Sequence, residues 1–150
     1  MRLIGRFLFA CLVLLVGEAQ AAPELRRHAP PAEERILPYT GLLPSCGDSS
    51  VLTQISWDFR DRERTYWSSD LAIAGFVEVR EIGYRDNGET YIPRRYCAAL
   101  ADFNDGRRRR VGYNLGEGLG FSGVGWGVEW CVVGLDRDLS FAPACKMTGP

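Results

Sequence analysis

The N-terminal 21 residues constrain the fold most strongly, because they determine the redox conditions under which the rest of the chain folds. Arg2 and Arg6 precede an apolar run at residues 7–16, and Ala19-Gln20-Ala21 follows as a small-x-small cleavage site. This three-part organisation is typical of a secretory signal peptide. The apolar run has about half the length that a membrane-spanning helix needs. The sequence therefore predicts cleavage after Ala21 and a mature protein that is periplasmic or secreted.

Four cysteines remain after such a cleavage: Cys46, Cys97, Cys131 and Cys145. An even number in an oxidising compartment predicts two disulfides, with three possible pairings. No two of them form a CxxC motif, which argues against a thioredoxin-type site and a zinc ribbon, and we expect no metal. Strand alternation puts Cys131 on the face opposite to Trp126, where a tail folding back would bring Cys145. We therefore expect the disulfides Cys131–Cys145 and Cys46–Cys97.

The charge balance argues against strongly charged polymers as partners. The formal net charge is −1 at pH 7, and cleavage would remove two arginines and one glutamate, which leaves −2. Such a chain has no overall electrostatic attraction to nucleic acids or anionic membranes. No second long apolar segment follows residue 21. We therefore expect no nucleic-acid partner and no transmembrane segment in the mature chain.

The mature chain divides into an arm and one domain. Residues 22–35 carry three prolines among charged residues and show no apolar period, which predicts a disordered arm. Residues 36–150 are enough for a single secreted domain with its own core. Its first segment, residues 36–44, is apolar but interrupted by proline and glycine, and we expect it to pack on the core as an extended strap.

A helix is predicted within residues 50–67, after a cap at Asp48 or Ser49. Apolar side chains recur there near helical spacing: Leu52, Ile55, Phe59 and Tyr66. We expect these side chains to form the face of the helix that packs on the core.

Four strands are predicted after the helix, because alternating apolar residues are separated by turn sequences. The strands cover residues 72–85, 91–103, 108–115 and 124–134. Asp86-Asn87-Gly88 and Asn104-Asp105-Gly106 are typical hairpin turns. A change of parity near Arg80 and Glu81 predicts a bulge in the first strand. The sequence thus predicts an α+β fold in which one N-terminal helix packs on a four-stranded antiparallel meander, a layout found in cystatin-like folds.

Four consecutive arginines beside the second turn are the first candidate binding residues: Arg107, Arg108, Arg109 and Arg110. Arginine suits bidentate contacts with anions, so an acidic partner, lipid head groups or a surface polysaccharide would fit. With the turn centred near Asp105, residue 108 should lie near 102 and residue 115 near 95. About two of the four arginines can then share a face, and Asp102 and Asp105 neutralise part of the run. The alternative is a solvated hairpin end whose charge protects a sheet edge.

Trp126 is the second candidate binding residue. Glycines flank it on both sides and leave room for a flat ligand such as a sugar ring. The alternative is core packing, which is common for aromatic side chains at strand spacing. Residues 118–123 match GxGxxG, but a strand follows where a dinucleotide site needs a helix, so we expect no cofactor.

Catalysis has weak support in the sequence. The one histidine, His28, lies in the predicted arm, which argues against a Ser-His or Cys-His pair. Two carboxylates from Glu89, Glu117 and Glu129 could serve glycoside hydrolysis, but their spacing selects no pair. We therefore assign no catalytic residue, and whether the protein is an enzyme stays uncertain.

Residues 91–97 (YIPRRYC) and 127–137 (GVEWCVVGLDR), with Pro44-Ser45-Cys46 before the helix, resemble a group of small exported alphaproteobacterial proteins of unassigned function. The resemblance covers most of the mature chain and implies a Gram-negative periplasm, but it carries over no catalytic residue. Our first hypothesis is a small binding or interaction module for an envelope protein or a glycan. The alternatives are an inhibitor or accessory subunit of an envelope enzyme, by analogy of fold, and a carboxylate-dependent hydrolase.

Overall fold

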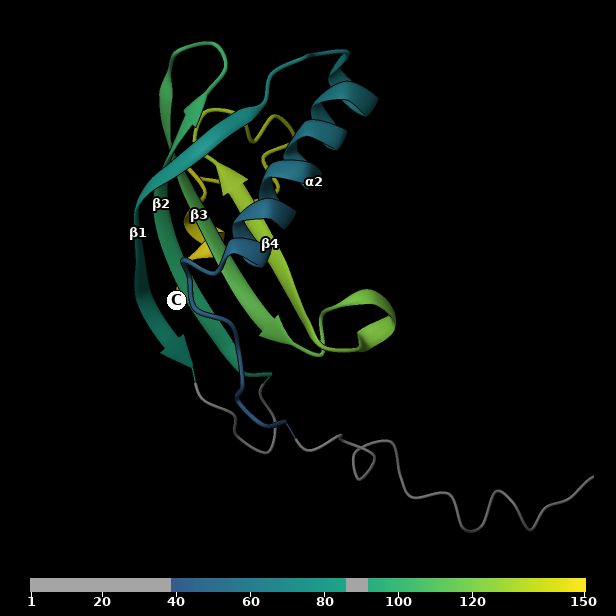
Figure 1. Cartoon of the computed structure of the whole chain (residues 1–150), viewed down its shortest axis with the longest axis vertical. Coiled ribbons are helices and arrows are strands. Elements are labelled where there is room, and N and C mark those ends of the chain that lie inside the picture. The colour runs from purple at the N-terminus through teal and green to yellow at the C-terminus, as the bar shows by residue number, and fades with distance from the viewer. Residues whose placement is uncertain (1–38, 86–91) are drawn as a thin grey trace, which may run out of the picture. The chain divides into compact units, whose positions relative to one another are not determined.

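The computed structural model describes residues 39–85 and 92–150, which fold as one helix packed on an antiparallel sheet (Figure 1). The elements are α2 (Ser49–Trp67), β1 (Ile73–Arg85), β2 (Arg94–Phe103), β3 (Arg108–Glu117) and β4 (Trp126–Val132). The strand order is β1-β2-β3-β4, so the predicted α+β meander is confirmed. The predicted signal peptide (1–21), arm (22–35) and first hairpin turn (86–88) lie outside the described residues.

Helix α2 begins at a side-chain cap and buries one stripe. The Asp48 carboxylate accepts a hydrogen bond from the backbone N–H of Ser50 at 2.9 Å, as a capping residue should. The buried residues recur every four positions: Val51, Ile55, Phe59 and Glu63. The prediction that Tyr66 belongs to this stripe is wrong, because its side chain is 73% exposed. Glu63 belongs to it instead, since its carboxylate pairs with Arg137 at 3.0 Å.

The side of the sheet that faces α2, here called the helix face, carries the large buried side chains. The ring of Phe59 meets Phe103 with 5.3 Å between centroids and Trp130 with 5.7 Å. Tyr113 is fully buried, and its hydroxyl donates a hydrogen bond to the backbone oxygen of Cys46 at 2.7 Å. Interlocking aromatic rings therefore fill the space between the helix and the sheet.

The other side, here called the tail face, is covered by parts of the C-terminal tail (residues 133–150, drawn in yellow in Figure 1), above all residues 144–149. Leu135 and Arg137 of the tail instead contact the helix side of the fold. The tail contains four turns and the short 3-10 helix η3 (Lys146–Thr148). The Cys131–Cys145 disulfide ties it to β4, whereas the Cys46–Cys97 disulfide ties the segment before α2 to β2. Both predicted disulfides are confirmed, and there is one for each face.

Glycines on the tail face let the tail approach the sheet closely. A Cβ atom added at Gly112 of β3 would overlap the side chain of Thr148, which is buried. A Cβ atom at Gly83 of β1 would lie 3.2 Å from the ring of Pro150. The tail therefore rests directly on backbone at these two positions.

Strand β1 contains the bulge that the change of parity predicts. Its pairing with β2 shifts register between Val77 and Arg80, and Glu78 has a φ of 52°. The extra residues place both Val77 and Arg80 opposite β2 residues of the tail face, Leu100 and Ala98. The bulge therefore directs the Arg80 side chain to the face that the tail covers.

Candidate functional site

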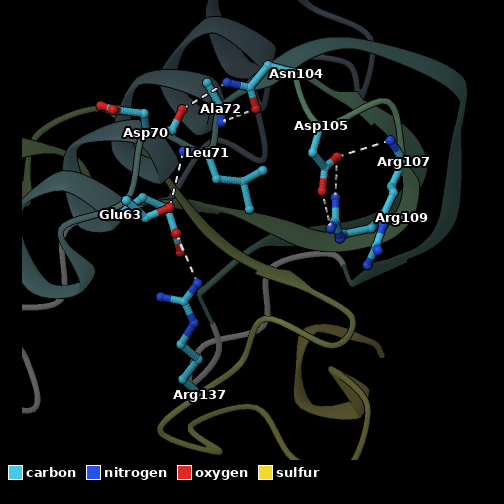
Figure 2. A network of polar contacts seen from close by, with 10 residues as sticks. Glu63, Asp70, Leu71, Ala72, Asn104, Asp105, Arg107, Arg109 and Arg137 are labelled. Carbon is cyan, nitrogen blue, oxygen red and sulfur yellow. Dashed lines mark hydrogen bonds and ion pairs between the residues drawn. The ribbon is translucent and has the colours of Figure 1, made fainter.

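Two of the four consecutive arginines are neutralised by their own hairpin. Arg108 pairs with Asp102 at 2.7 Å, and Arg109 pairs with Asp105 at 2.6 Å. Figure 2 shows Asp105 between Arg109 and the backbone N–H of Arg107, which donates a hydrogen bond at 3.0 Å. The Arg109 guanidinium lowers the pKa of Asp105 to about 2, and Arg108 holds the pKa of Asp102 below its usual range. These contacts neutralise part of the run, as the sequence predicts.

The remaining two arginines, Arg107 and Arg110, lie at different places in the fold. Residue 108 pairs with 102 and residue 115 with 95, which is the predicted register. Alternation along β3 puts Arg110 on the tail face and Arg109 on the helix face, where it lies 4.6 Å from the centroid of Phe103. Arg107 lies before β3 at the exposed hairpin end. The run is therefore not one patch.

Trp126 lies at the far end of the sheet from these arginines. It pairs with Glu117, the last residue of β3, whereas Arg108 is the first. The length of β3, about 30 Å at the usual rise per residue, separates the two candidates. The space beside Gly127 is taken by the backbone of Leu119, although Gly125 opens on free space. Trp126 itself packs against the core. The arginine run and Trp126 therefore do not form a common site.

The candidate carboxylates already have other partners. The Glu117 carboxylate accepts hydrogen bonds from the backbone N–H groups of Thr40, at 2.9 Å, and Gly41, at 2.8 Å. These bonds hold the strap on the sheet and lower the pKa of Glu117. Glu129 pairs with Arg94 at 2.8 Å, and strand alternation puts it on the opposite face from Glu117. Glu89 lies outside the described residues.

A groove of about 310 Å³ lies on the tail face, between the sheet and the C-terminal tail. Its floor includes Ala98 and Leu100 of β2, and its walls include Val133 and the Cys145 side of the disulfide. Ala98 lies directly opposite Gly112 in the pairing of β2 with β3. Two of the smallest residues thus meet at the centre of the face, and the hollow forms because no large side chain fills it. Its lining is more apolar than that of the hollows along α2, and we therefore take this tail-face groove as the candidate site among the described residues.

Three cations surround the tail-face groove: Arg80 of β1, Arg110 of β3 and Lys146 of η3. None of the three makes an ion pair with another described residue. Glu78 is the one carboxylate among the described lining residues, so the lining carries a net charge of +2. Uncompensated cations beside an apolar floor attract a ligand of negative charge.

Sequence reasoning identified Arg110 but missed Arg80 and Lys146, because the three are far apart in the chain. The useful signals were the small pair Ala98 and Gly112 on neighbouring strands, and the tail cysteine predicted to return to that face. Lys146, one residue after Cys145, is also the only lysine in the chain. A disulfide that fixes the tail therefore fixes the position of this amine.

Comparison of the chain with protein-family models, with curated proteins and with solved structures found no match. Within residues 39–85 and 92–150, no cluster of histidine, cysteine, aspartate and glutamate has the arrangement of a metal site. No helix in the same ranges has the length and apolar character needed to cross a membrane. The two disulfides are consistent with an extracytoplasmic protein. The chemistry of the groove is therefore the best guide to function.

Proposed function

We propose that this protein is a small binding module that works in a Gram-negative periplasm or after secretion, and that its ligand occupies the tail-face groove. The observation that carries this proposal is the pairing of an apolar floor with three cations that have no ion-pair partner among the described residues. Ligand sites are concave, mostly apolar and equipped with a few convergent polar groups. The groove combines these properties on a rigid sheet.

A binding role has better support than carboxylate catalysis. Glycoside hydrolysis needs two carboxyl groups about 5–10 Å apart on either side of one bond. Glu117 and Glu129 face opposite sides of the sheet, and each is held by its own partners. The groove itself has one carboxylate, Glu78, among its described lining residues. The two candidate carboxylates, Glu117 and Glu129, therefore do not form a pair that suits this chemistry.

The single lysine makes the proposal testable with one reporter. Reductive methylation with ¹³C-formaldehyde labels Lys146 and the N-terminal amine, and it keeps both positive charges. The purified protein, with both disulfides formed, is titrated with a panel of anionic, neutral and cationic fragments. We expect a saturable shift of the Lys146 methyl signal with at least one fragment. A signal that no fragment moves contradicts the proposal.

A matched pair of variants locates the binding site. Ala98→Leu fills the floor of the groove, whereas Ala74→Leu adds the same volume at an exposed position of β1 outside it. The first substitution should abolish the shift of the Lys146 signal, and the second should leave the shift unchanged. Equal shifts in the two variants would place the binding site elsewhere.

One observation favours a second candidate function, an inhibitor or accessory subunit that presents a loop to an envelope enzyme. The loop between β3 and β4 contains the short 3-10 helix η2 (Phe121–Gly123) and exposes Phe121 and Val124 at 95% and 75%. Exposed apolar side chains at a loop tip are typical of a contact with a partner protein. Phe121→Ser would then weaken partner binding and leave the ligand-induced shift of the Lys146 signal unchanged. Ala98→Leu would abolish that shift and leave partner binding unchanged.

A further inference from the structure

We propose that the ligand of the tail-face groove is a small single-chain amphiphile, with a short hydrocarbon chain and one acidic head group. This inference rests on the proposed function and adds the chemical class of the ligand. The head group would be a carboxylate or a phosphate monoester, because both present the oxygens that arginine binds.

The floor of the groove determines the chemistry of the buried part of the ligand. Ala98 and Leu100 of the floor, like Val133 of the wall, offer no side-chain hydrogen-bonding group. The backbone of β2 and β3 beneath them is engaged in the sheet. The Thr148 hydroxyl donates to the backbone oxygen of Cys145 at 2.7 Å. A sugar or nucleobase would leave its own polar groups unpaired on this floor, so a hydrocarbon chain fits better.

The rim of the groove determines the charge of the head group. Arg80, Arg110 and Lys146 come from a bulged strand, a central strand and the disulfide-anchored tail. The sheet and the disulfide hold their backbones before any ligand arrives, which reduces the ordering cost of binding. Arg108 and Arg109 next to Arg110 are bound by aspartates, whereas the three rim cations make no ion pair with a described residue. An acidic head group supplies the missing partner.

The size of the groove favours one short chain. Its volume of about 310 Å³ lies at the lower end of the range of about 300–1,000 Å³ that is usual for small-ligand pockets. It corresponds to the space of about ten liquid water molecules. A phospholipid with two long chains exceeds this space. A chain of medium length with its head group at the rim does not.

Calorimetry tests the proposed hydrocarbon chain of the ligand. The protein is titrated with hexanoate, octanoate and decanoate, each below its micellar concentration. We expect about fourfold tighter binding for each added methylene group, because burying one methylene group contributes about 0.8 kcal/mol. Affinity that does not change with chain length overturns the inference. Equal binding of acetate and octanoate overturns it as well.

Octanol and octyltrimethylammonium test whether the head group must be acidic, since they keep the eight-carbon chain and change only the head group. We expect octanoate or octyl phosphate to bind at least tenfold more tightly than either. Tighter binding of octyl phosphate indicates a phospholipid-derived ligand, and tighter binding of octanoate indicates a free carboxylic acid. Both results support the inference, whereas equal binding of octanol contradicts it.

Single variants assign the head-group contacts. Arg80→Gln and Arg110→Gln should each weaken octanoate binding at least tenfold and leave octanol binding unchanged. Arg107→Gln is the matched control, because Arg107 lies at the exposed hairpin end outside the groove. If no amphiphile binds but other fragments still shift the Lys146 signal, this inference fails and the proposed function survives. If no compound shifts that signal, both fail.

Discussion

The two faces of the sheet are closed in opposite ways. On the helix face, Phe59, Phe103 and Trp130 fill the space with aromatic rings in mutual contact. On the tail face, the tail rests on Gly112, and the small side chain of Ala98 leaves a hollow beside it. The large apolar side chains are concentrated on the helix face, and their burial supplies most of the stability. The tail face has smaller side chains, which leave space for a ligand.

A disulfide secures each face, and the two should differ in what they hold. The Cys46–Cys97 bond closes a sequence separation of 51 and ties the start of α2 to the core. The Cys131–Cys145 bond closes a separation of 14 and ties only the tail. Loop closure in the unfolded chain gives about 4 kcal/mol for the first and about 3 kcal/mol for the second.

The largest effect is therefore expected from removing the disulfide of the helix face. Cys46→Ala with Cys97→Ala should lower the free energy of unfolding by about 4 kcal/mol, measured by chemical denaturation. Cys131→Ala with Cys145→Ala should cost about 3 kcal/mol, release the tail and abolish binding in the groove, while the near-UV spectrum of the aromatic core persists. Identical melting of the parent protein with and without a reductant would sink this expectation for both bonds.

A smaller effect is expected from added volume on the tail face. The new methyl group of Gly112→Ala would overlap Thr148, so we expect a loss of about 2 kcal/mol and faster hydrogen exchange of the Thr148 amide. Gly75→Ala is the matched control, because a Cβ atom at Gly75 meets nothing within 4 Å. It should be neutral or slightly stabilising. Equal stability of the two variants would show that the tail is not packed on Gly112.

The smallest effect concerns the buried hydroxyl of the helix face. Burial raises the pKa of Tyr113 to about 12, whereas a tyrosine in the unfolded chain titrates near 10. Between pH 10 and 12 the unfolded chain loses this proton first, so stability is intact below pH 10 and falls as the pH rises through that window. Tyr113→Phe should remove the last step of the tyrosinate absorbance titration and cost about 1 kcal/mol at neutral pH, because the hydrogen bond to Cys46 is lost. A titration curve that keeps its last step in this variant would contradict the assignment.

Local chemistry explains why much of the fold could be predicted. The turn Asn104-Asp105-Gly106 fixes the register of β2 and β3, so the pairing of residue 102 with 108 follows from counting. The strict alternation around Cys131 separates its face from that of Trp130, which suggested the disulfide with Cys145. The type of a turn and the alternation of side chains along a strand are properties of short segments, so they can be read directly from the sequence.

The rest depends on contacts between distant segments. Glu63 is buried because Arg137, 74 residues later, reaches its carboxylate, and helical periodicity treats a glutamate as solvent-facing. The groove depends on how closely the tail approaches Gly112 and on a bulge that turns Arg80 toward it. No short window of the sequence contains these partners together. The sequence therefore indicated the run of four arginines as a candidate site but gave no sign of Arg80 and Lys146.

The covalent loop of the tail has an evolutionary consequence. Between the two half-cystines Cys131 and Cys145, Leu135 packs against the buried core and Arg137 pairs with Glu63, whereas residues 138–143 line neither that core nor the groove. Insertions in such a closed surface loop cost little, since the entropy of closure grows only slowly with length. An insertion beside Ala144 can therefore change the wall of the groove, and with it the choice of ligand, while the helix-face core keeps its packing.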